Sequence, residues 1–80
     1  MGDLRYRYLE EIGLTKSEIK VYLALLEIGE SSKGDIVRKA KIAASKVYDV
    51  LDKLIDKGLV SFIIKNNVGL TTIDESNVVR

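Results

Sequence analysis

The chain has 80 residues, 46% of them apolar, which suffices for one small domain with a hydrophobic core. It contains no cysteine and no histidine, which excludes disulfides, thiolate metal sites and the commonest general base at neutral pH. The formal net charge of +1 excludes a uniformly basic binding surface. No apolar run approaches the ~18 residues of a membrane span, and no signal-peptide pattern is present, so we expect a cytoplasmic protein.

The charged side chains are unevenly distributed along the chain. Residues 1–30 carry four basic and six acidic side chains, whereas residues 31–57 carry seven basic and four acidic ones. Residues 58–80 are balanced. The middle of the chain is therefore the mildly basic part, and the candidate for contact with an anionic partner.

Two helices are predicted in the first thirty residues. Residues 4–12 follow a helical pattern, and a central helix over residues 16–28 begins at a capping box formed by Thr15 and Glu18. The central helix is apolar over so wide an arc that we expect it in the middle of the core. Its predicted inward side chains are Ile19, Val21, Tyr22, Leu23, Leu25, Leu26 and Ile28.

Two further helices follow, separated by a short turn. Ser32 is the expected cap of a helix over residues 33–40, and a longer helix over residues 44–57 ends before Gly58. The intervening turn, residues 41–43, has the length typical of a helix-turn-helix motif. The predicted inward stripe of the longer helix consists of Val47, Val50, Leu51, Leu54 and Ile55.

Residues 59–73 have the pattern of a β-hairpin, or wing. We expect strands over residues 59–65 and 70–73, with a turn over residues 66–69, because asparagine and glycine suit the positive φ angles of tight hairpins. Residues 75–80 are interpreted as a short tail or the start of a truncated helix. The sequence predicts a mostly α domain over residues 3–74, a winged helix-turn-helix of three to four helices and a two-stranded wing.

The helix over residues 44–57 is the predicted recognition helix, whose first residues reach base edges in the major groove of DNA. Lys46 points away from the apolar stripe and is either a DNA contact or a solvated lysine. Ser45 either donates to a phosphate or base edge, or caps the helix. Ala44 meets a thymine methyl group, or is there only as a good helix former.

Two neighbouring residues of that helix are ambiguous. Tyr48 either packs its ring at the edge of the core or offers its hydroxyl to a phosphate. Asp49 would repel phosphate. Its alternatives are to accept a hydrogen bond from a cytosine amino group or to orient Lys46.

Basic and polar side chains outside that helix supply the remaining candidates for DNA contact. The preceding helix and turn carry a cluster of cations that we expect on phosphates, although each alone is also explained as a solvated charge. They are Lys33, Arg38, Lys39 and Lys41. On the wing, Lys65 and Asn66 are candidates for a DNA contact, and Asn66 is equally explained by turn chemistry.

Other classes of function receive less support from the residues. Without histidine, cysteine, a phosphate-binding loop or clustered carboxylates, no catalytic constellation, cofactor or small-molecule site is expected. The alternative is a protein-interaction module, favoured by the near-neutral charge, by a poorly basic wing and by Asp49, Asp52 and Asp56 on the outer face of the long helix. Leu4, Tyr6 and Tyr8 offer more apolar surface than a small core needs, which predicts a homodimer interface.

Four segments resemble the N-terminal winged-helix domain of the TrmB-like transcriptional regulators, a family found mainly in archaea. They are residues 12–15 (IGLT), 21–26 (VYLALL), 45–51 (SKVYDVL) and 57–60 (KGLV). The resemblance covers roughly residues 9–73 and implies sequence-specific binding of double-stranded DNA by a homodimer. Ala43 and Ala44 stand where members often have proline and arginine, and the sugar-sensing domain of longer members has no counterpart in these 80 residues.

Overall fold

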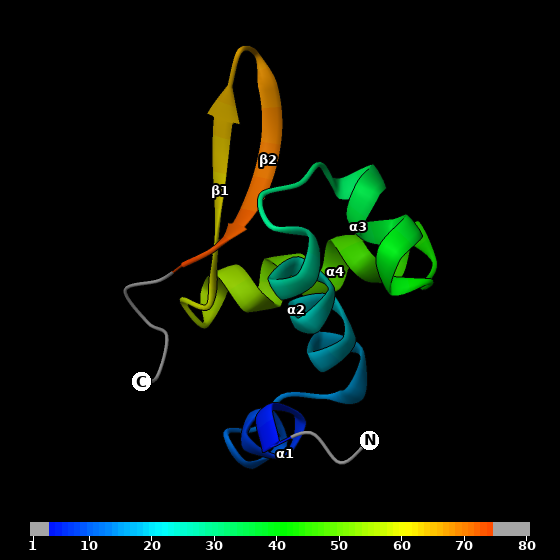
Figure 1. Ribbon diagram of the computed structural model, residues 1–80, viewed down its shortest axis with the longest axis vertical. Coiled ribbons are helices and arrows are strands. Elements are labelled where there is room, and N and C mark those ends of the chain that lie inside the picture. The colour runs from blue at the N-terminus through cyan, green and yellow to red at the C-terminus, as the bar shows by residue number, and fades with distance from the viewer. Residues whose placement is uncertain (1–3, 75–80) are drawn as a thin grey trace.

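The computed structural model describes residues 4–74, which form four helices followed by a two-stranded antiparallel hairpin (Figure 1). The helices are α1 (Leu4–Glu11), α2 (Lys16–Ile28), α3 (Lys33–Ala40) and α4 (Ala44–Asp56). The strands are β1 (Val60–Lys65) and β2 (Val68–Ile73). The hairpin projects from one end of the molecule and α1 lies at the other, with the remaining helices between them. This is the predicted winged helix-turn-helix fold. The predicted tail over residues 75–80 lies outside the described residues.

The helix starts follow from local hydrogen bonds that the sequence predicts. The hydroxyl of Thr15 accepts from the amide of Glu18 at 3.3 Å, and the Glu18 carboxylate accepts from the amide of Thr15 at 2.8 Å. The capping box is therefore confirmed, and it satisfies two amides that a helix start leaves unpaired. Ser32 caps α3 in the same manner, since its hydroxyl accepts from the amide of Asp35 at 3.3 Å.

The core lies where α2, α3 and α4 pack together, and Val60 extends it to the base of the wing. The largest completely buried side chains are Ile19, Leu25, Ile36, Leu51, Leu54, Val21, Val47 and Val60, together with Thr71. Three inward predictions were wrong, because Leu26 and Ile55 are each 39% exposed and Ile28 is 37% exposed. A domain of this size has too few elements to cover the whole apolar arc of a helix.

The wing has a shorter turn than predicted. Val68 and Gly69 belong to β2, where they pair with Lys65 and Ile64, so the connection contains only the two asparagines of residues 66–67. Both asparagines have positive φ, 51° and 64°. A two-residue loop with positive φ at both positions matches the right-handed twist of the strands, which is the reason that the hairpin closes here.

A third backbone segment joins the wing to the helices. Ser31, just before α3, forms an antiparallel bridge with Thr71 of β2, through hydrogen bonds of 3.0 Å and 2.8 Å. Both residues are buried. The bridge fixes the base of the hairpin against the start of α3, which determines where the wing stands relative to the helix-turn-helix.

Candidate nucleic-acid interface

The start of α4 is exposed and has no side-chain cap. The turn before it reverses at Lys41, which adopts the left-handed conformation with φ 59° and closes α3 by donating its amide to Val37. Ala43 is the N-cap residue and provides no side-chain hydrogen bond to the helix. Ser45 is the second residue within the helix, so the interpretation of Ser45 as the cap is wrong. Its exposed hydroxyl and the side chain of Lys46 both lie at the surface.

The predicted cations divide into two groups. Lys33, Lys41 and Lys46 are exposed and form no ion pair with any residue of the described range 4–74. The others are paired: Lys39 with Glu27 at 3.3 Å, Lys65 with Glu30 at 3.1 Å, and Arg38 with Asp35. Exposed pairs of this kind contribute about 0–1 kcal/mol to stability, so an incoming phosphate can displace the carboxylate at little cost.

The charge of α4 changes sign along its outer surface. Asp49 pairs with Lys53 one turn later, at 3.4 Å, and not with Lys46. The exposed side chains of Asp52 and Asp56 follow. An anion would therefore meet a cation at the start of α4 and carboxylates over its second half.

Tyr48 lies where α3, α4 and the wing meet. Tyr48 is 47% exposed, and the Nζ atom of Lys33 lies 5.0 Å from the centroid of its ring. The same nitrogen is 5.7 Å from the ring centroid of Phe62 on β1. Sequence reasoning missed Phe62, although an aromatic residue among the alternating positions of an exposed strand could have signalled a surface role.

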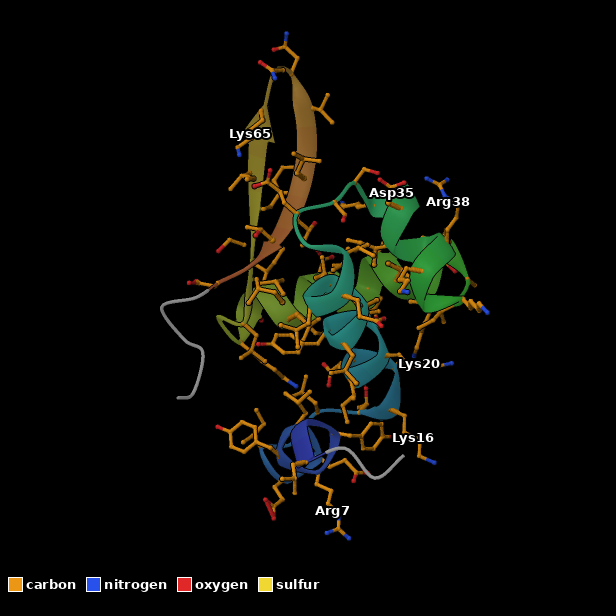
Figure 2. All side chains as sticks on the ribbon, in the orientation of Figure 1. Arg7, Lys16, Lys20, Asp35, Arg38 and Lys65 are labelled. Carbon is orange, nitrogen blue, oxygen red and sulfur yellow. The ribbon has the colours of Figure 1, made fainter. Side chains whose placement is uncertain are left out.

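A second set of basic side chains lies away from the wing. Figure 2 shows Lys65 on the hairpin and Arg38 on α3, with Arg7 and Lys16 near the α1 end and Lys20 on α2. Lys20, like Arg7 and Lys16, forms no ion pair with another residue in the described part of the chain. Lys20 thus offers a matched comparison for Lys46, as an exposed helical lysine on another element.

The far end of α4 is fixed by the buried carboxylate of Glu18, through a long-range pair that the sequence did not predict. The Nζ atom of Lys57 donates to both carboxylate oxygens of Glu18, at 3.1 Å and 3.2 Å. Burial acts to raise the pKa of the Glu18 carboxyl, but the Thr15 amide and the Lys57 ammonium outweigh it, so the pKa is lowered from 4.5. The pair joins the start of α2 to the end of α4 and holds that end of α4 in place.

The predicted dimer residues do not share one environment. Leu4 is 79% exposed and Tyr8 also lies at the surface, whereas Tyr6 is half-buried and packs against the core. Leu4 and Tyr8 are therefore available for contact with a second molecule. None of the helices within residues 4–74 is both long and apolar enough to cross a membrane.

Comparison with known sequences identifies the family. The family model described as "Sugar-specific transcriptional regulator TrmB" matches residues 9–74. The HTH-type sugar sensing transcriptional regulator TrmBL1 of Pyrococcus furiosus is 40% identical over 55 residues. That match covers 69% of this chain but only 16% of the relative, so the chain spans a small part of the relative's length.

Comparison with solved structures gives the same fold. A MarR family protein from Bacillus stearothermophilus is 26% identical with a TM-score of 0.76, over 90% of this chain and 52% of that one. TrmBL2, an archaeal chromatin protein, is 23% identical with a TM-score of 0.74, over 91% of this chain and 28% of that one. The resemblance inferred from the sequence segments is thus confirmed, and the chain belongs to the TrmB family of transcriptional regulators.

Proposed function

We propose that this chain is the sequence-specific DNA-binding part of a transcriptional regulator and that α4 enters the major groove. The observation that carries the proposal is the exposed start of α4, where Ser45 and Lys46 stand free of intramolecular partners in the described chain. The names of two relatives agree with it: TrmBL1 is called a transcriptional regulator, and the TrmBL2 structure is described by its mode of DNA binding. The proposed activity is binding, not catalysis, and its expected location is the cytoplasm.

Base reading is assigned to the first turn of α4. Lys46 can donate to the O6 and N7 atoms of guanine, and Ser45 can bond several base edges. The methyl group of Ala44 suits contact with a thymine methyl. Asp49 limits the choice of base, because its carboxylate can accept a hydrogen bond from a cytosine amino group and repels phosphate. To bind cytosine, Asp49 must release Lys53, which costs little because that ion pair is exposed.

Phosphate contacts are assigned to the cations around that turn. Lys33 and Lys41 have no carboxylate partner within the described residues, so neither must give up an ion pair to bind phosphate. Lys39 and Lys65 would exchange Glu27 and Glu30 for phosphate oxygens. Asn66 is exposed at the wing tip, where its amide can reach the backbone or the minor groove.

A homodimer is proposed through α1, with Leu4 and Tyr8 as the contact residues and Tyr6 supporting them from the core side. A two-fold dimer would present two copies of α4 about 34 Å apart, the spacing of successive major grooves on one face of DNA. The matching operator would be roughly palindromic.

Fluorescence anisotropy of random-sequence duplex DNA, titrated with salt, tests the proposal. We expect micromolar binding at low salt and a log–log salt dependence with a slope of several units, because several phosphates are neutralised. Selection from a random library should then yield a site bound at least ~10³-fold more tightly than random DNA. Binding without such a preference would contradict base reading by α4.

The second candidate is a winged helix that contacts a protein and not DNA. The acidic outer half of α4, with Asp52 and Asp56 exposed, favours it, because these carboxylates would repel the phosphate backbone. A folded protein that binds no duplex at low salt would support this candidate and reject DNA binding.

A further inference from the structure

Lys33 connects three elements of the candidate interface. Its ammonium nitrogen lies 5.0 Å from the ring centroid of Tyr48 on α4 and 5.7 Å from that of Phe62 on β1. Both distances fall within the ~6 Å range of a cation–π interaction. Lys33 is itself exposed and forms no ion pair with any residue between positions 4 and 74.

Both aromatic residues lie at the surface and are not covered by the core. Tyr48 is 47% exposed and Phe62 is 48% exposed. The ring of Phe62 also lies against Gly69 of β2, where an added Cβ would come within 2.7 Å of Cζ of Phe62. The glycine therefore leaves the space that the ring occupies. The wing thus supplies one ring within cation–π range of Lys33, and α4 supplies the other.

Helix stability does not explain a cation at this position. Lys33 is the first residue of α3 after the cap Ser32, and the positive end of a helix macrodipole disfavours a cation there. Asp35, the acidic residue of the same turn, pairs with Arg38 instead. An ammonium group has three N–H donors, and because Lys33 is exposed, a donor remains available to an external acceptor beside the two rings.

We propose that Phe62, together with Tyr48, is a positioning residue that holds the ammonium of Lys33 toward a phosphate of the DNA backbone. The wing then contributes to binding through an aromatic residue of β1, in addition to the contacts proposed for Lys65 and Asn66. The inference rests on the DNA binding proposed above and adds to it a residue of β1. A lysine that already makes cation–π contacts with two rings loses less side-chain conformational entropy when it binds a phosphate than a freely moving lysine does.

The test is a double-mutant cycle between Lys33→Ala and Phe62→Leu, followed by anisotropy on one duplex at several salt concentrations. Leucine keeps an apolar side chain over Gly69 but removes the aromatic face. Phe62→Tyr keeps that face and serves as the rescue variant. Ile64→Ala is the matched control, because Ile64 lies two residues along β1 on the same face and is 69% exposed. Thermal melting of each variant checks that it is folded.

We expect Phe62→Leu to weaken binding about two- to fivefold on every duplex, as loss of an exposed cation–π contact predicts. Lys33→Ala should lower the salt slope by about one, and Phe62→Leu should then have no further effect. Phe62→Tyr and Ile64→Ala should bind as the wild type does. Two results would overturn this inference alone. One is that Phe62→Leu lowers the DNA affinity by the same factor in the wild type and in Lys33→Ala; the other is that Phe62→Leu binds DNA as tightly as the wild type. A wild-type protein that binds no duplex at low salt would overturn it together with the proposed function.

Discussion

The two ends of α4 are built in opposite ways. At its start, the cap residue Ala43 makes no side-chain hydrogen bond, and Lys46 has no carboxylate partner within the described residues. At its end, Lys57 donates to the buried Glu18 carboxylate, and Gly58 takes the positive φ of 76° that lets the chain turn into β1. The rear of the helix is thus stabilised by specific contacts that the front lacks.

The contrast separates residues that maintain the fold from residues that are free to meet a partner. Binding surfaces commonly carry features that do not improve stability, because the same groups must remain available to the ligand. In α4 the missing side-chain cap and a lysine without an ion pair to the described residues occur together, within one turn.

Truncation of the inner face should have the largest effect. Leu51 is buried, and Leu51→Ala should lower the free energy of unfolding by about 2–5 kcal/mol, through lost burial and the cavity left behind. Urea denaturation measures this loss. Ile55→Ala, on the partly exposed next turn, is the control and should cost clearly less. An unchanged melting temperature for Leu51→Ala would contradict the packing of α4.

Loss of the ion pair between Glu18 and Lys57, at the end of α4, should have the next largest effect. Glu18→Gln keeps an acceptor for the Thr15 amide but removes the charge that holds Lys57, and should cost roughly 1–3 kcal/mol of stability. The lost charge also predicts a pH dependence. Because the folded-state pKa of Glu18 is lowered from 4.5, its contribution is complete above pH 4.5 and disappears as the pH falls through the folded-state value.

Urea denaturation between pH 7 and pH 3 separates this contribution from the remaining carboxylates. The stability difference between the wild type and Glu18→Gln should shrink as the pH falls. A difference that stays constant over this range would show that the Glu18 charge does not stabilise the fold.

Removal of the Lys46 ammonium at the start of α4 should affect DNA binding and not the stability of the fold. Lys46→Ala should weaken binding of a selected duplex by about 1–3 kcal/mol if Lys46 makes a bidentate base contact, and leave the melting temperature unchanged because the side chain is exposed. Lys20→Ala, which removes an exposed lysine from α2, should leave the affinity almost unchanged. An equal loss on every DNA sequence would make Lys46 a phosphate contact, and an equal effect of both variants would remove the special role of the front of α4.

Addition of a cap should have the smallest effect, in the opposite direction. Ala43 has an extended backbone, φ −57° and ψ 143°, which is compatible with a capping serine. Ala43→Ser should therefore stabilise the protein by about 1 kcal/mol, measurable as a raised melting temperature. A lowered melting temperature would indicate that the helix does not begin at this residue.

The local features of this fold could be read from the sequence, and the long-range ones could not. The capping box of Thr15 and Glu18 is visible because its two residues are three positions apart. Glu18 and Lys57 are 39 positions apart, so no local sequence pattern predicts that they pair. The contacts of Lys33 with the rings of Tyr48 and Phe62 likewise depend on how α3, α4 and β1 pack together.

Apolar periodicity also overstates what is buried. It correctly identifies the faces of α2 and α4, but Leu26 and Ile55 remain partly exposed, because burial depends on what lies against each turn. The candidate site has the same limitation. The sequence indicates which cations are near α4. Only the fold distinguishes Lys33, Lys41 and Lys46, which have no carboxylate partner among residues 4–74, from lysines held by carboxylates.

The most direct test of the central claim is the backbone amide NMR spectrum of the protein titrated with duplex DNA. The two ends of α4 should respond differently. We expect the largest shift changes at residues 41–49, with smaller ones at Lys33 and along the wing, and little change at Asp56 or Lys57. Changes concentrated on the second half of α4 or on α1, with the first turn of α4 unaffected, would contradict the account.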